Sequence, residues 1–178
     1  RGISLNVDVA FNNGLKIIAG GTLMENTLTE NGITEQQILT ENFTGTWAVT
    51  YKIRKTNFSV DYTGNVYSPM RLPLLGKLDP RAPYSPWWSI QNIQLTFSGT
   101  KKLEIYGGVK NLLNWTPKSN PFLIARSNDP FDKQVQFTSN GKVIATPDNP
   151  NALTFDPNYV YAPNQGARAF FGVRYHIR

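Results

Sequence analysis

The amino-acid sequence predicts an all-β fold, an antiparallel meander of about seven long strands. Apolar and polar residues alternate with period two in one stretch after another. Short turn-forming segments separate some of these stretches, and long segments rich in Pro, Asn and Gly separate the others. Because successive side chains of a strand point to opposite faces, this alternation gives each predicted strand one apolar face and one polar face.

The first predicted hairpin occupies the N-terminal part of the chain. Apolar residues stand at alternate positions of its first strand: Ile3, Leu5, Val7, Val9 and Phe11. Asn12-Asn13-Gly14 then supplies residues that tolerate positive φ, and Leu15 to Met24 is predicted to run back as the partner strand.

Two further hairpins and a final strand follow the same plan. The second hairpin turns at Arg54 to Asn57 and places these residues on one face: Trp47, Val49, Tyr51, Ile53, Phe58, Val60, Tyr62 and Val66. The third turns at Gly99 to Lys102, with Ile93, Leu95 and Phe97 before the turn and Leu103, Ile105, Gly107 and Val109 after it. The last predicted strand carries Ala169, Phe171, Val173, Tyr175 and Ile177.

Connections between the predicted strands alternate strictly in length. Segments 12–14, 54–57 and 99–102 are tight turns, whereas segments 27–40, 69–87 and 113–166 are long loops. Within the longest loop, Gln134 to Thr138 and Lys142 to Thr146 flank Ser139-Asn140-Gly141, which predicts a small hairpin. We therefore expect one trimmed end of the sheet and one elaborate end.

Strand length and loop asymmetry favour a membrane barrel over a soluble sandwich. The predicted strands span about 10 to 13 residues, about twice the usual globular strand and enough to cross a bilayer at a tilt. Outer-membrane barrels combine short periplasmic turns, long extracellular loops and aromatic girdles. Aromatic residues expected near strand ends fit such girdles: Trp47, Tyr51, Tyr62, Trp87, Trp88 and Tyr175.

Two alternatives remain open from the pattern alone. A soluble β-sandwich that binds carbohydrate would also alternate, with its apolar faces packed inward and strands of about five or six residues. A complete eight-stranded barrel would need one strand beyond the seven predicted.

Composition excludes several other classes of protein. The net charge of +6 comes from Lys and Arg that are scattered rather than gathered into a stripe, so no nucleic-acid partner is expected. The chain has no Cys and one His, His176, which excludes a zinc site built from N and S ligands. We find no nucleophile paired with a base and no phosphate-binding loop, and we expect neither an enzyme nor a cofactor.

The number of strands predicts on which side of the membrane each end of the chain lies. If the short turns are periplasmic, seven strands place the C-terminus in the periplasm and Arg1 at the extracellular, loop-bearing end. Seven strands cannot close a membrane barrel of even strand number, so we expect the rest of the barrel, and the true N-terminus, to lie outside this chain.

The second half of the chain resembles the C-terminal end of TonB-dependent receptors, especially the iron, haem or cobalamin type found in Bacteroidetes. The residues that carry the resemblance are Asp79 to Trp87, Ser89 to Thr96, Leu103 to Asn114, Ser127 to Asp132, Thr154 to Pro157, Tyr159 to Gly166 and Arg168 to Tyr175. The Gly-Val-Lys-Asn-Leu run of the third group is the most specific part. The spacing of Gly172, Tyr175 and Ile177 is similar to the signal read by the barrel-assembly machinery, although Phe170 and Arg178 depart from it.

This resemblance implies a role for the whole chain. Residues 1–178 would form the C-terminal part of a 22-stranded transmembrane barrel, without the plug domain and the earlier strands. The expected location is the bacterial outer membrane, and the expected activity is active uptake of an iron–siderophore, haem or cobalamin. The implied partners are outer-membrane lipid, the barrel-assembly machinery, the nutrient ligand and the TonB-ExbB-ExbD complex, which would act through the missing N-terminal part.

Candidate ligand-binding residues lie in the predicted loops. Aromatic rings able to stack on a flat ligand or a sugar are Trp87, Trp88, Trp115, Tyr159 and Tyr161, and Arg81 and Arg126 would attract an anionic ligand. Interface anchoring and loop packing compete with this interpretation for the aromatic residues. Glu25, Glu30, Glu35 and Glu41 would either gather a cation such as Ca²⁺ or simply solvate their loop.

Overall fold

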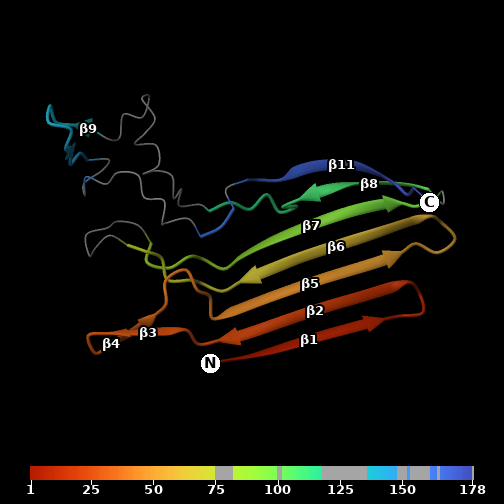
Figure 1. The fold of residues 1–178 in the computed structure, drawn as a ribbon, viewed down its shortest axis with the longest axis horizontal. Coiled ribbons are helices and arrows are strands. Elements are labelled where there is room, and N and C mark those ends of the chain that lie inside the picture. The colour runs from red at the N-terminus through yellow and green to blue at the C-terminus, as the bar shows by residue number, and fades with distance from the viewer. Residues whose placement is uncertain are drawn as a thin grey trace.

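The protein is described by a computed structural model that covers residues 1–74, 82–99, 102–117, 136–147, 152, 161–163 and 165–177. Seven long strands form one antiparallel sheet in the order β1-β2-β5-β6-β7-β8-β11, which confirms the predicted meander (Figure 1). Their bounds are β1 Gly2–Ala10, β2 Leu15–Met24, β5 Phe43–Lys52, β6 Phe58–Tyr67, β7 Trp88–Phe97, β8 Leu103–Lys110 and β11 Arg168–Tyr175. No helix in the described part of the chain is long and apolar enough to cross a membrane.

The two ends of the sheet differ as the sequence predicted. The three tight turns gather at the end that also holds the C-terminus, and the N-terminus lies at the opposite end with the long connections (Figure 1). We call these the turn end and the loop end. Even across the longest connection, β8 pairs directly with β11, from Lys110 with Arg168 to Leu103 with Tyr175.

Two small hairpins stand at the loop end. One pairs β9 (Gln136–Phe137) with β10 (Val143–Ile144), which confirms the hairpin predicted inside the longest connection. The other pairs β3 (Thr27–Glu30) with β4 (Ile33–Gln36), in a segment that the sequence predicts to be a loop. Its turn is Asn31-Gly32, with φ of 51° and 77°, the pair that a two-residue hairpin turn favours. Each of its strands has only four residues, so the alternation was too short to predict a hairpin.

The long strands are shorter than predicted, with 8 to 10 residues instead of about 10 to 13. Asn111 shows why β8 stops at Lys110. It adopts a φ of 52°, which turns the chain out of the sheet. Its Nδ2 donates to the carbonyl oxygens of Trp115 and Gln165 at 2.7 and 3.0 Å, and its Oδ1 accepts the Trp115 N–H at 3.0 Å. These bonds fix the start of the longest connection.

Register sorts the sheet into two faces. Directly paired residues share a face, so Ile17, Val49, Tyr62, Ile93 and Val109 lie together on what we call the outer face. Ile18, Ala48, Thr63 and Asn92 lie together on the opposite, inner face. Within the described residues no second sheet covers the outer face, and the buried hydrophobic side chains gather at the loop end: Met70, Leu72, Trp88, Tyr161 and Ala162.

Candidate functional site

The outer face of the sheet is apolar and uncovered. Ile3, Leu5 and Phe171 are 71%, 70% and 75% exposed. Other exposed apolar or aromatic residues on this face are Val7, Val9, Leu23, Tyr51, Phe58, Leu95, Val173 and Tyr175. A water-soluble domain rarely leaves so continuous an apolar surface open, so this face is built to contact apolar surroundings.

The inner face carries polar pairs that run across the strands. Thr50 donates from Oγ1 to Asp61 at 2.6 Å, and Lys16 pairs with Asp8 at 3.2 Å. Arg174 forms an ion pair with Glu104 from the neighbouring strand. The charged residues Asp8, Lys52, Asp61, Glu104, Lys110 and Arg174 all share this face.

A hollow of about 390 Å³ lies on this inner face beside the middle of β6 and β7 and the end of β8. Its polar lining comes from Asp61, Thr63, Asn92, Gln94 and Lys110, and Phe170 of β11 closes one side. The Lys110 ammonium lies 5.6 Å from the centre of the Phe170 ring, so a cation is held over an aromatic face. A carboxylate, an ammonium and two amides thus converge on one small space that can bond a polar segment.

At the loop end, inner-face aromatic rings form a stack. The rings of Tyr67 and Trp88 lie 4.2 Å apart at 25°, and those of Trp88 and Trp115 lie 5.4 Å apart at 21°. Tyr67 and Trp88 are directly paired across β6 and β7. The buried Met70, Leu72, Tyr161 and Ala162 pack around this stack. It is the hydrophobic core of the described residues, and it seats the loops on the sheet.

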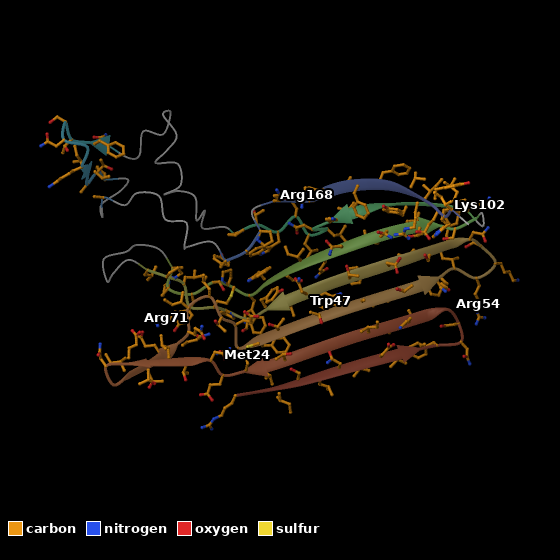
Figure 2. All side chains as sticks on the ribbon, in the orientation of Figure 1. Met24, Trp47, Arg54, Arg71, Lys102 and Arg168 are labelled. Atoms are coloured by element: carbon orange, nitrogen blue, oxygen red, sulfur yellow. The ribbon has the colours of Figure 1, made fainter. Side chains whose placement is uncertain are left out.

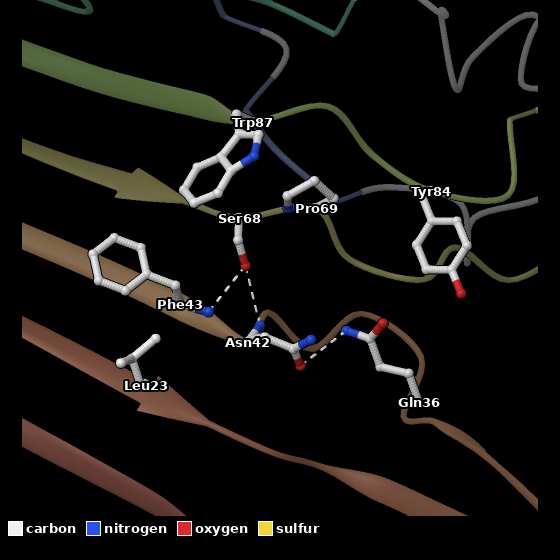
Figure 3. Close-up of a pocket in the computed structure, with 8 residues that line it drawn as sticks. All are labelled: Leu23, Gln36, Asn42, Phe43, Ser68, Pro69, Tyr84 and Trp87. Atoms are coloured by element: carbon white, nitrogen blue, oxygen red, sulfur yellow. Dashed lines mark hydrogen bonds between the residues drawn. The ribbon is translucent and has the colours of Figure 1, made fainter.

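An apolar pocket of about 650 Å³ opens on the other side of the same end (Figure 3). Its walls are Leu23 and Phe43 from the outer face, Pro69, and the rings of Tyr84 and Trp87, with Gln36, Asn42 and Ser68 at its polar floor. The Phe43 and Trp87 rings lie 6.0 Å apart at 49°. Figure 3 shows the two bonds in which Ser68 Oγ accepts the N–H groups of Asn42 and Phe43, at 3.1 and 2.9 Å.

Hydrogen bonds fasten the loop segments behind this pocket to one another. The N–H of Met70 donates to Ser85 Oγ at 2.9 Å, and the N–H of Ser85 donates to the Met70 carbonyl at 2.9 Å. Arg71 pairs with Glu35 at 2.5 Å and donates to the Gln36 carbonyl at 3.2 Å. These bonds join the connection between β2 and β5 to the connection between β6 and β7.

The structure separates the predicted ligand-binding residues. Trp88, Trp115 and Tyr161 come together in the stacked core, where Trp88 and Tyr161 are each only 9% exposed and the rings cover one another's faces. Trp87 is 56% exposed and lines the outer pocket instead. Arg81, Arg126 and Tyr159 lie outside the described residues. A ligand-binding role for these residues stays a prediction.

Sequence reasoning missed several residues that build these sites. Tyr67 completes the aromatic stack, and Leu23, Phe43 and Tyr84 line the outer pocket. Alternation assigns Phe43 and Trp87 to one face, but it does not show that they meet across two strands. To predict this contact one must know the register in which the strands pair, and the alternation of residues does not give that register.

One expectation about individual residues needs correction. Trp47 and Tyr62 do not lie at strand ends: each is the fifth residue of a ten-residue strand, and their rings pack together 6.3 Å apart on the outer face. Among the described residues no group of three acidic side chains converges on a point where a metal ion would bind. Glu35 is bonded to Arg71 instead, and Glu41 accepts from Thr44 at 2.7 Å.

Known protein structures share this fold. The siderophore receptor PiuA from Acinetobacter baumannii matches with a TM-score of 0.57 and 12% identity, covering 98% of this chain and 21% of the receptor. The ferric-catecholate import receptor Fiu from E. coli K12, in its closed form, matches with a TM-score of 0.59 and 11% identity, covering 98% and 20%.

The ferric enterobactin receptor PfeA from Pseudomonas aeruginosa, as a G324V mutant, matches with a TM-score of 0.56 and 15% identity, covering 97% and 21%. The chain thus spans about a fifth of the length of the structures it matches. No protein-family model matches the chain, and no curated protein matches its sequence.

Proposed function

We propose that this chain is part of the barrel wall of a TonB-dependent outer-membrane receptor that takes up a scarce nutrient, with a ferric siderophore as the first candidate. One observation carries the proposal: a single-layer sheet with an uncovered apolar face has the same fold as a fifth of three siderophore or ferric-chelate receptors. The likeness to the Bacteroidetes type rests on the sequence motif around Gly107 to Asn114.

Membrane insertion accounts for the outer face better than any soluble arrangement. Burying apolar area is worth roughly 25 cal/mol per Å², so leaving these side chains in water forgoes a large stabilisation. Hydrocarbon supplies the missing contact for residues such as Leu5, Leu95 and Phe171. The inner face, with its ion pairs, would then line the barrel lumen.

The two edges of the sheet support the view that more strands belong to the barrel. Among the described residues, both β1 and β11 pair with a neighbouring strand on one side only. Unpaired backbone groups within hydrocarbon cost several kcal/mol each, so a bilayer demands a partner for each edge. A 22-stranded barrel with a plug, as the sequence resemblance implies, would supply both partners.

The remaining parts of the proposal concern the whole receptor. Energy would come from the TonB-ExbB-ExbD complex through the N-terminal part, and the barrel-assembly machinery would fold the wall. The polar hollow beside Asp61 and Lys110 offers the plug a bonding surface. We propose binding and transport, without catalysis, as the activity of this chain.

The carbohydrate-binding sandwich finds no support in the fold, because a sandwich would cover the outer face with a second sheet. A complete eight-stranded barrel would join β1 to β11 through an eighth strand. The sheet of described residues instead has seven strands and stays open between those two edges.

The first experiment is to find the parent polypeptide in native membranes. Antibody against this chain should detect, in the outer-membrane fraction, a species several times larger than 20.0 kDa. A soluble species near 20.0 kDa would sink the proposal. Growth of a deletion strain on ferric siderophore, haem or cobalamin as the sole source then identifies the nutrient.

A further inference from the structure

The turn end of the sheet carries an excess of positive charge, whereas the loop end carries cations and acids in similar numbers. At the loop end, Glu25, Glu30, Glu35 and Glu41 all lie between β2 and β5. At the turn end, segments 11–14, 53–57, 98–102 and 176–178 contain no Asp or Glu. Among the described residues they carry Arg54, Lys55, Lys102 and His176. Figure 2 shows Arg54 and Lys102 at this same end of the sheet.

Hydrogen bonds join the turns into one continuous rim. Arg54 donates from Nη2 to the Asn12 carbonyl at 2.6 Å, which links the second turn to the first. The N–H of Ser98 donates to the Asn57 carbonyl at 2.8 Å, and the N–H of His176 donates to the Lys102 carbonyl at 2.8 Å. The cations are therefore carried on a connected backbone and not on independent loops.

Nearby acids do not neutralise this rim. The carboxylates of the adjacent strand ends, Asp8 and Glu104, are paired with Lys16 and Arg174 on the inner face. Arg54, Lys55 and Lys102 are exposed, and none of them forms an ion pair with a described residue. Three exposed side-chain cations thus lie at the turn end without an acidic partner among the described residues.

An aromatic row lies beside these cations on the outer face. Tyr51 and Tyr175 are 41% and 60% exposed near the ends of their strands. The Phe58 and Phe97 rings, paired across β6 and β7, lie 4.9 Å apart. Aromatic rings prefer the boundary between hydrocarbon and headgroups, so this row marks that depth and places the cations at the headgroups.

We infer that the turn end is a binding surface for the anionic headgroups of phospholipids in the leaflet that it faces. This inference rests on the proposed membrane function, and the occupant follows from charge: exposed Lys and Arg, aromatic neighbours and no acid suit a lipid phosphate. Short turns of outer-membrane barrels face the periplasm, so the lipid is a phospholipid of the inner leaflet. Each Lys or Arg near such a surface strengthens binding roughly fivefold.

The test uses the full receptor in nanodiscs of phosphatidylethanolamine with a minority of phosphatidylglycerol. After partial removal of lipid, mass spectrometry measures which lipid stays on the protein. We expect phosphatidylglycerol to be enriched at least roughly fivefold over the bulk, and the enrichment to fall as salt is raised. Equal retention of both lipids, or enrichment that salt leaves unchanged, would overturn the inference.

Variants locate the effect. Arg54→Gln, Lys55→Gln and Lys102→Gln together should abolish the enrichment, and Lys55→Gln with Lys102→Gln should reduce it while keeping the Arg54 bond to Asn12. Arg54→Lys should retain it. Lys142→Gln with Arg168→Gln removes loop-end cations and should change nothing. Enrichment that persists in the triple variant, or is lost equally in the loop-end control, contradicts the inference.

Failure of this inference differs from failure of the proposed function. A parent protein that never reaches the outer membrane contradicts the proposed function. A parent that inserts as a barrel but retains both lipids equally contradicts only the headgroup site.

Discussion

On the outer face of the sheet Ile3, Leu5 and Phe171 stay exposed, whereas on the inner face Thr50, Asp61, Glu104 and Arg174 bond to one another across strands. Both faces come from the same backbone and alternate residue by residue. In a soluble sheet the apolar face would be the interior. Here the apolar face is the one that no second sheet covers within the described residues, as the proposed barrel wall requires. Substitutions at neighbouring positions can test that inversion.

The largest loss of stability is expected at Trp88, which is buried, in contrast to its exposed neighbour Trp87. Trp88→Ala should lower the free energy of unfolding of the parent protein by about 3–5 kcal/mol, because it empties the buried stack against Tyr67 and Trp115. Trp87→Ala removes an exposed ring that touches Phe43 and should cost about 1 kcal/mol. Denaturant unfolding in lipid vesicles measures both.

A conservative variant checks the cause at this position. Within the described residues Trp88 Nε1 has no hydrogen-bond acceptor, so Trp88→Phe loses packing volume and no bond. We expect it to cost less than about 1.5 kcal/mol. Equal losses for Trp87→Ala and Trp88→Ala would contradict the assignment of Trp88 to the core.

The next largest loss of stability is expected when an arginine is placed on the outer face of β5, compared with an arginine on its inner face. In the proposed membrane setting, Val49→Arg puts a cation on the lipid-facing side of the strand and should cost about 2–4 kcal/mol. Ala48→Arg puts the same charge on the inner face and should cost less than about 1 kcal/mol. Both replace small apolar residues, so only the face differs. Assembly in the outer membrane and unfolding in vesicles report the difference, and a larger cost for Ala48→Arg would reverse the assigned faces.

Two glycines covered by aromatic rings give a smaller contrast. The Tyr106 ring lies over Gly172 on the inner face, and the Trp47 ring lies over Gly64 on the outer face. Gly172→Ala should cost about 1–3 kcal/mol, because Tyr106 is held between Phe170 and Arg174 and cannot swing away. Gly64→Ala should cost less, since Trp47 can move into lipid.

A double variant tests the glycine explanation. If crowding of the ring causes the loss, Tyr106→Ala should remove most of the additional cost of Gly172→Ala in a double-mutant cycle. Strictly additive costs would mean that the ring and the glycine do not interact.

The smallest effect is expected from the ion pair between Arg174 and Glu104. Arg174 is 59% exposed at its side chain, so Arg174→Gln should lower the free energy of unfolding by less than about 1 kcal/mol. The loss should shrink further at high salt. A cost approaching that of Val49→Arg would show that the inner face is drier than its exposure indicates.

The sequence determined the sheet because its rules are local. Alternation placed Ile93 and Leu95 on one face, and Asn12-Asn13-Gly14 marked a turn. The candidate site depended on tertiary contacts instead. Trp87 and Trp88 are equally aromatic in the sequence, and only the packing of the loop-end core around Trp88 buries it. Trp47 is the first residue of its strand in the alternating pattern, whereas β5 begins at Phe43.

Because β8 pairs directly with β11, the connection between them can vary in length during evolution. The connection between these strands is roughly tenfold longer than the turn between β7 and β8, yet closing it costs only about 2 kcal/mol more in chain entropy, because the cost grows with the logarithm of length. Insertions at the loop end therefore cost little, while backbone pairs keep the register of the sheet fixed. New loop-end sequences can thus arise without loss of the sheet.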